Sequence, residues 1–343
     1  MRVAMYYSNS DVRVENIPTP EIGPGELLVK VQACGVCGSD VMEWYRIKKA
    51  PLVLGHELAG DIVEIGSDID GEKFKVGDRV AVTHHVPCNT CDHCLAGHHS
   101  VCDTLRTTNF YPGGFSEYLR VPAINVDRGT FTLPEGMSYD EGAFLEPLGC
   151  VFRGQRLAGF KPGMSVLIIG SGITGLLYVK LLKALGAGLI ATTDISEFKL
   201  SKARKFGADH TFNAREDVPS RFREVNNGKL ADFVVLCSGA TPAVETAFDT
   251  VGRGGTILFF APPGPEAKIN FPLFRLWKDE VTTVTSYAAS PLDLYKAMEL
   301  IRAGRITIDE MITHRLPLEE VQAGFMLTAR SEENLKVIIE PQN

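Results

Sequence analysis

Four of the eight cysteines in this 343-residue sequence lie within fifteen residues of one another. They are Cys88, Cys91, Cys94 and Cys102. Four thiolates in one short segment are enough to complete a tetrahedral zinc shell, which leaves no position open to a substrate. The spacing therefore predicts a structural zinc site.

A second set of metal-ligand residue types is dispersed along the chain. Cys37 begins the run Cys37-Gly-Ser-Asp40, His56 and Glu57 are adjacent, and Glu146 follows much later. One thiolate, one imidazole and one or two carboxylates form a mixed set that leaves a zinc position for water or substrate. These residues predict a second, catalytic zinc, with Glu57 and Glu146 both open as the carboxylate ligand.

A glycine-rich segment follows the apolar run VLII and precedes the run LLYVKLLKALGA. Between a strand and a helix, such a turn lets the backbone approach a pyrophosphate and directs helix amides at its charge. The predicted dinucleotide-binding residues in it are Gly170, Gly172, Ile173, Thr174 and Gly175.

The strand after this turn ends at Asp194. A carboxylate at that point accepts hydrogen bonds from the adenosine ribose hydroxyls and repels a 2′-phosphate, so we expect NAD rather than NADP. Lys199 lies five residues further on and is a candidate for an additional hydrogen bond to the ribose.

Hydrophobic patterning divides the chain into two domains. Residues 1–121 contain short β-branched runs bounded by Gly, Pro or Asp, which indicates a β-rich barrel or sandwich. The run Ser138-Tyr-Asp-Glu141 has the form of a capping box and predicts a helix reaching toward Leu157. Apolar strands then alternate with amphipathic helices, which is typical of a doubly wound parallel sheet.

We therefore predict a two-domain α/β protein. The first domain is expected over residues 1–154 and the second, dinucleotide-binding domain over residues 155–286. The tail, residues 287–343, reads as two helices and a strand, which is too little for an independent core, so we expect it to complete the first domain.

Composition excludes several classes of protein. Hydrophobic residues make up 45% and charged residues 22%, as in ordinary globular proteins. A net charge of -7 opposes nucleic acid as a partner. Asp11 and Glu15 interrupt the N-terminus where a signal peptide needs an apolar stretch, and the apolar stretch 176–191 is too short to cross a membrane. We expect a soluble cytoplasmic protein, where clustered thiols are metal ligands rather than disulfides.

Taken together, these motifs resemble the medium-chain, zinc-dependent alcohol dehydrogenases, and within them the polyol (sorbitol) and threonine dehydrogenase branch. The motifs follow the family's order over essentially the whole chain. The resemblance implies a GroES-like catalytic domain joined to a Rossmann domain, with the active site in the cleft between them. It also implies an NAD-dependent enzyme with two zinc ions per chain that converts a secondary alcohol or polyol to the ketone.

The resemblance further implies roles for individual residues. Cys37 and His56 correspond to zinc ligands, and Glu57 or Glu146 to the third. Asp40 resembles the carboxylate that orients the ligand imidazole, and Ser39 the hydroxyl that passes the substrate proton toward the cofactor ribose. The family is dimeric or tetrameric, so we expect a homodimer or homotetramer whose sheets join near the GTILFF segment.

The sequence departs from sorbitol-type enzymes around the expected substrate. Glu43 stands where those enzymes have a tyrosine, Met42 stands where several relatives have a histidine, and the segment around Tyr287 lacks their arginine. These departures argue against sorbitol itself. We expect residues 43–46 near the mouth of the cleft and take Glu43 and Tyr287 as the candidate substrate residues.

Other interpretations remain open. The chain could act on a different carbonyl compound, such as an amino alcohol or a 2-amino-3-ketoacid. A zinc-independent quinone reductase of the same superfamily normally lacks both the cysteine lobe and the cysteine at position 37, and a nucleic-acid-binding zinc finger needs basic residues that the lobe lacks. We expect the five nearby histidines to be surface loop residues: His84, His85, His93, His98 and His99.

Overall fold

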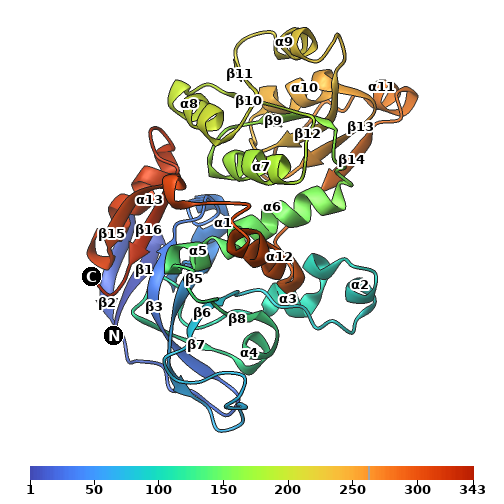
Figure 1. Ribbon diagram of the computed structural model, residues 1–343. Coiled ribbons are helices and arrows are strands. Elements are labelled where there is room, and N and C mark those ends of the chain that lie inside the picture. The colour runs from blue at the N-terminus through green and yellow to red at the C-terminus, as the bar shows by residue number, and fades with distance from the viewer. Residues whose placement is uncertain (262) are drawn as a thin grey trace. The chain divides into compact units, whose positions relative to one another are not determined.

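The computed structural model describes residues 1–261 and 263–343, and these divide into two compact units (Figure 1). The first unit comprises Met1–Gly149 and Ala288–Asn343, and the second comprises Cys150–Tyr287. The expected boundary after residue 154 falls inside helix α6 (Leu145–Leu157), whereas the units divide after Gly149. Among the described residues, no helix has the length and apolar composition that crossing a membrane requires.

The first unit is built on two β-sheets. The larger has the order β15-β16-β3-β5-β6-β8, with β7 paired to β3, and the smaller has the order β2-β1-β4. Their strands are β1 (Arg2–Ser8), β2 (Asp11–Asn16), β3 (Leu27–Gly35), β4 (Leu52–Val53), β5 (Glu57–Ile65), β6 (Arg79–Val82), β7 (Tyr118–Val121), β8 (Thr130–Thr132), β15 (Ile312–Pro317) and β16 (Lys336–Glu340).

Most helices of this unit are short, and the longer ones are α6, α12 and α13. They are α1 (Glu43–Arg46), η1 (Ile47–Lys49), α2 (Asp92–Leu95), η2 (His99–Val101), α3 (Asp103–Thr107), α4 (Ala123–Gly129), α5 (Tyr139–Ala143), the start of α6, α12 (Pro291–Arg302), η3 (Asp309–Met311), η4 (Leu318–Glu320) and α13 (Val321–Arg330).

The C-terminal tail contributes directly to the larger sheet. β16 pairs antiparallel with β3, so that Ile338 lies opposite Gly35 and Ile339 opposite Cys34. Val337 and Ile339 are buried in the same hydrophobic core as Val29, Val31 and Leu58. Burial of these β-branched and leucine side chains holds the last strand against the β-rich N-terminal segment.

The predicted capping box is present, but the helix it opens is shorter than expected. Ser138 Oγ accepts the Glu141 amide at 3.1 Å, and Glu141 Oε2 accepts the Ser138 amide at 2.8 Å. The helix α5 ends before Phe144, and α6 begins at once after it. Pro147 explains the break, because a proline has no N–H with which to continue the helical hydrogen bonds.

The second unit is the predicted doubly wound parallel sheet. Its order is β11-β10-β9-β12-β13-β14, and every neighbouring pair is parallel. The strands are β9 (Ser165–Ile169), β10 (Leu189–Asp194), β11 (His210–Asn213), β12 (Ala231–Leu236), β13 (Val251–Phe259) and β14 (Thr282–Thr285), and the helices are the rest of α6, α7 (Ile173–Ala184), α8 (Glu197–Phe206), α9 (Val218–Val225), α10 (Thr241–Thr250) and α11 (Leu273–Lys278).

In Figure 1, α7 lies on one side of this sheet and α9 and α10 lie on the other, which is the layering that parallel crossovers require. The GTILFF segment forms most of β13, which is not an edge strand because β14 lies beyond it. The segment thus lies one strand in from the edge of the sheet, as expected for a segment near that edge, and the joining of sheets between copies stays a prediction.

The glycine-rich turn between β9 and α7 has the expected strand-turn-helix setting. Gly170 has a φ of 97°, which favours glycine. A Cβ placed on Gly175 would lie 1.9 Å from the Gly170 carbonyl oxygen, whereas a Cβ on Gly172 would meet no atom within 4 Å. Gly175 is thus needed for the packing of helix on strand, and Gly172 leaves open space at the helix N-terminus.

These two glycines give a matched pair of substitutions. Gly175→Ala should lower the free energy of unfolding by at least ~2 kcal/mol, because its methyl group clashes with backbone that cannot move aside. Gly172→Ala should change it by less than about 0.5 kcal/mol but weaken dinucleotide binding. Urea denaturation and cofactor titration measure the two effects, and equal destabilisation by both substitutions would contradict this assignment.

Candidate active site and zinc sites

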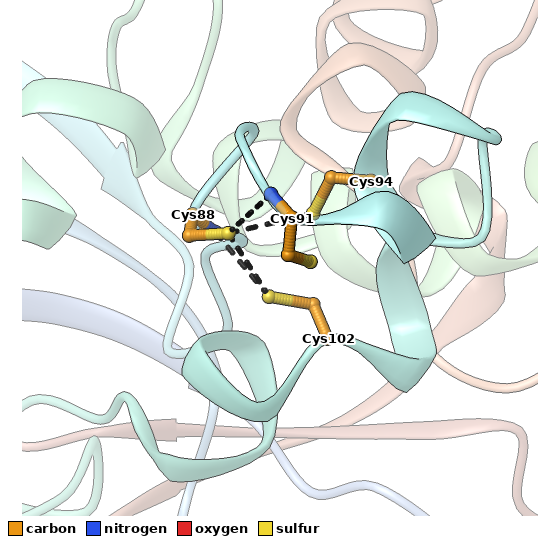
Figure 2. Close-up of side chains that lie close together, drawn as sticks. All are labelled: Cys88, Cys91, Cys94 and Cys102. Carbon is orange, nitrogen blue, oxygen red and sulfur yellow. Dashed lines mark hydrogen bonds between the residues drawn. The ribbon is translucent and has the colours of Figure 1, made fainter.

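The four cysteines of the lobe converge on one point (Figure 2). Their Sγ atoms all lie within 4.8 Å of one another, and Cys88 Sγ is 3.6 Å from that of Cys102 and 3.9 Å from that of Cys94. A tetrahedral zinc with bonds of about 2.3 Å separates its sulfur ligands by about 3.8 Å. All eight cysteines are free thiols in the structure, and this group matches a zinc shell in both distance and chemistry.

Backbone amides in the lobe donate hydrogen bonds to a cysteine sulfur and favour its ionised form. The amides of Thr90 and Cys91 donate to Cys88 Sγ at 3.4 and 3.3 Å. These hydrogen bonds lower the pKa of Cys88 to about 5, and the bond from Thr90 has the largest effect. A thiol that ionises readily is already in the form that binds zinc.

A second group of ligand atoms lies at one end of an antiparallel strand pair. Atoms of Cys37, His56 and Glu57 lie within 4.8 Å of one another. β3 and β5 run antiparallel with Gly35 opposite Glu57, so the residue just beyond β3 lies beside those at the start of β5. Sheet register thus brings together residues that are about twenty positions apart in sequence.

A buried carboxylate orients the histidine of this group. Asp40 Oδ1 lies 3.3 Å from His56 Nδ1, and Asp40 Oδ2 accepts the Cys37 amide at 3.0 Å. Burial raises the pKa of Asp40, but His56 and Arg46 outweigh that effect and hold the pKa below its ordinary value. With Nδ1 facing Asp40, Nε2 of His56 is left for a metal.

A buried lysine on the last strand holds the glutamate. Lys336 Nζ donates to Glu57 Oε2 at 2.5 Å and to the Val36 carbonyl at 3.2 Å, and both charged side chains are almost fully buried. Burial lowers the pKa of Lys336, but the charges of Glu57 and Cys37 more than compensate and raise it. Sequence reasoning missed this residue. The one sequence feature that could have indicated it is a lysine directly before the apolar run Val337-Ile338-Ile339.

The donor set fits a zinc ion that keeps an open position. One thiolate, one imidazole and one carboxylate are the mixed ligands found in catalytic zinc sites. Glu146 lies in the first turn of α6, half-buried, and contributes to the electrostatic field at Lys336. It is not among the residues whose ligand atoms the structure brings together.

Two histidines expected on the surface lie instead beside this group. The ring centroid of His84 is 4.8 Å from that of His56 and 3.7 Å from that of His85. Burial lowers the pKa of His84 well below its ordinary value and that of His85 to about 4. Both follow β6, which pairs with β5, and that pairing carries them to His56 rather than to the exterior of the lobe.

The remaining site residues are distributed less closely. Ser39 Oγ accepts a hydrogen bond from Arg46 at 3.0 Å. The carboxylate of Glu43 accepts the backbone amide of Asn9 at 3.0 Å, so it is engaged at the turn between β1 and β2. Tyr287 is the last residue of the second unit and is half exposed.

Two parts of the expected dinucleotide site, the glycine-rich turn and Asp194, are in contact within the second unit. Asp194 accepts the backbone amides of Ser171 and Ser196, each at 2.9 Å, which fixes its carboxylate at the glycine-rich turn. Each carboxylate oxygen keeps a further lone pair for a ligand hydroxyl. Lys199 is buried in the first turn of α8.

Substitution of one lobe cysteine should remove one metal ion. Cys91→Ser should lower the zinc content from two ions to one per chain and the melting temperature by several degrees, because the lobe has few apolar residues to hold it. Cys150→Ser is the matched control and should keep both ions. Elemental analysis and calorimetry provide the readout, and an unchanged zinc content in Cys91→Ser would refute the site.

Comparison with known proteins matches both units. The family model described as the alcohol dehydrogenase GroES-like domain matches residues 23–129, and that described as zinc-binding dehydrogenase matches residues 174–303. Sorbitol dehydrogenase of Bacillus subtilis is 31% identical over 99% of this chain and 97% of its own. A probable D-xylulose reductase A of Aspergillus clavatus is 34% identical over 92% of this chain and 89% of its own.

Solved structures agree with these matches. A putative zinc-binding dehydrogenase of Sinorhizobium meliloti, crystallised with NADP, is 30% identical over 99% of both chains with a TM-score of 0.88. The expected GroES-like and Rossmann architecture is thus confirmed, as is the expectation of a zinc-binding dehydrogenase. The chain is an oxidoreductase that belongs to the medium-chain, zinc-dependent alcohol and polyol dehydrogenases.

Proposed function

We propose that Cys37, His56 and Glu57 hold the catalytic zinc and that the enzyme oxidises a secondary alcohol or polyol to the ketone with NAD. The observation that carries the proposal is the convergence of these three ligand atoms, with Asp40 behind the imidazole. The grouping supports Glu57 rather than Glu146 as the carboxylate ligand. The free cysteines suit a reducing compartment, and we place the enzyme in the cytoplasm.

Each residue of the group has a distinct task. Bound zinc supplies Lewis-acid chemistry that eases ionisation of an alcohol, and bound NAD supplies the hydride acceptor. Cys37 and Glu57 bring negative charge that retains the cation, and Asp40 keeps Nε2 of His56 directed at it. Ser39, two residues after Cys37, accepts the proton that the alcohol loses.

Loss of the thiolate should remove turnover and spare cofactor binding. Cys37→Ser should lower kcat with secondary alcohols and polyols by at least ~10³-fold, because a Lewis acid contributes several kcal/mol to charge stabilisation. NADH binding, followed by fluorescence, should change less than about twofold, because the dinucleotide residues lie in the other unit. A Cys37→Ser enzyme that keeps full activity after metal chelation would disprove the proposal.

Asp194 supports NAD as the cofactor. Its carboxylate is fixed against the Ser171 amide and should repel a 2′-phosphate. The Sinorhizobium meliloti relative was crystallised with NADP, so a preference for NAD would distinguish this chain from that relative. We expect kcat/KM to be at least about tenfold higher with NAD than with NADP, which corresponds to ~1.4 kcal/mol. Asp194→Ser should reduce that ratio, and a wild-type preference for NADP would show that the assignment is wrong.

A second copy of the chain is the partner we propose for the β14 edge. Among the described strands, β14 is paired on one side only, by β13, and α11 immediately before it exposes Leu273, Phe274 and Trp277 by 67 to 73%. An unpaired strand beside a large apolar patch is typical of an interface rather than of a free surface. A two-fold axis would place the same strand and helix of two copies together.

Negative charges on the exposed apolar face of α11 should lower the number of chains in the assembly. The double substitution Phe274→Asp and Trp277→Asp should halve the mass measured by light scattering, because burying carboxylates at the contact is costly. Leu95→Asp, at a leucine 74% exposed on the lobe, is the control and should leave the mass unchanged. The interface lies elsewhere if the double variant keeps the wild-type mass or if Leu95→Asp lowers it.

A further inference from the structure

Arg46 reaches back from the end of α1 to the turn that carries Cys37, Ser39 and Asp40. Its Nε donates to the Ser39 carbonyl and its Nη2 to Ser39 Oγ, both at 3.0 Å. The same Nη2 lies 3.5 Å from Asp40 Oδ1, and the arginine side chain is only 15% exposed. Sequence reasoning expected this residue near the mouth of the cleft, and the structure shows that its side chain is hydrogen-bonded to the turn.

The donor chemistry of arginine fixes the direction of the serine hydroxyl. A guanidinium donates hydrogen bonds, accepts none and does not lose its proton in proteins. In this contact Ser39 Oγ must therefore be the acceptor, and its own hydrogen must point elsewhere. One lone pair of Oγ is taken by Arg46, which leaves one lone pair to accept a proton and one hydrogen to give away.

We propose, on the basis of the function proposed above, that Arg46 is a positioning residue that orients the Ser39 hydroxyl for proton transfer to and from the substrate. The substrate hydroxyl gives its proton to the free lone pair of Ser39 Oγ while the hydrogen already on Oγ leaves to a hydroxyl or water on the way to solvent. Ser39 is neutral before and after this exchange. The hydride lost from the alcohol carbon reduces the nicotinamide, so one alcohol yields one ketone, one NADH and one proton.

Arg46 also suits this task electrostatically. Its charge is balanced by Asp40, whose Oδ1 lies 3.5 Å from Arg46 Nη2, so the cation can stay in the mostly buried turn beside Ser39. The fork of two donors on Ser39 is specific to a planar guanidinium, because a lysine ammonium is a single point of charge. Arg46→Lys should keep the charge and lose part of the orientation.

A double-substitution cycle in the metal-loaded enzyme tests the proposal. Arg46→Gln should lower kcat by ~10- to 100-fold, within the range that positioned proton transfer contributes, and should leave KM for the alcohol within about twofold. In a Ser39→Ala background the same substitution should cost less than about twofold, because the group it orients is gone. Arg46→Lys should fall between wild type and Arg46→Gln. Lys49→Gln, which removes a neighbouring exposed cation that also lies over the Tyr45 ring, should leave kcat unchanged.

Two further readouts do not depend on activity. The zinc content and melting temperature of Arg46→Gln should equal those of wild type, and its crystal structure should show Ser39 Oγ in a different rotamer. If Arg46→Gln loses metal, Arg46→Lys takes its place in the cycle with Ser39→Ala.

Several results would overturn the proposal. Losses in kcat that multiply in the double variant would show that Arg46 acts independently of Ser39, and a raised KM with unchanged kcat would show that it binds substrate instead. Loss of zinc from both Arg46 variants would assign it to the metal site through Asp40. If the wild-type enzyme were inactive with every alcohol and polyol, the proposed function itself would be refuted. That result is distinct from every outcome of the substitution cycle, which compares active variants.

Discussion

The buried ion pair between Lys336 and Glu57 is the contact on which the catalytic group depends. It joins β16, at the end of the chain, to the first residue of β5, with both side chains almost fully buried. Removal of one partner from such a pair leaves an unpaired charge inside the protein, which typically costs 3–5 kcal/mol. The pair also explains why the tail belongs to the first unit: only with β16 beside β3 does a cation reach Glu57.

From this pair the charges alternate across the site. Lys336 meets Glu57, and on the other side of the group His56 meets Asp40, which in turn meets Arg46. Arg46 and Lys336 thus each hold a carboxylate in or beside the group that we propose as the zinc ligands. A cation placed among Cys37, His56 and Glu57 adds positive charge where thiolate and carboxylate supply negative charge, so metal binding and folding support each other.

Local motifs were predictable from sequence, and long-range partners were not. The cysteine lobe, the glycine-rich turn and the capping box at Ser138 depend on residues close together in the chain, and the structure has all three. Lys336 is 279 residues from Glu57, and only the pairing of β16 with β3 brings it near. His84 and Arg46 are nearer in sequence, but their positions follow from the β5–β6 pairing and from the path of α1, which no short motif encodes. The break at Phe144 is a local effect of Pro147, but the helical pattern on both sides of it predicted one continuous helix.

We propose that this chain builds two zinc sites of different character, a closed shell of four sulfurs and an open shell of mixed ligands. X-ray diffraction from crystals of the zinc-loaded enzyme, measured on both sides of the zinc absorption edge, tests this most directly. We expect two anomalous peaks per chain, one among Cys88, Cys91, Cys94 and Cys102 and one bonded to Cys37 Sγ, His56 Nε2 and a carboxylate oxygen. A single peak at the lobe, or a second peak away from Cys37 and His56, would contradict it.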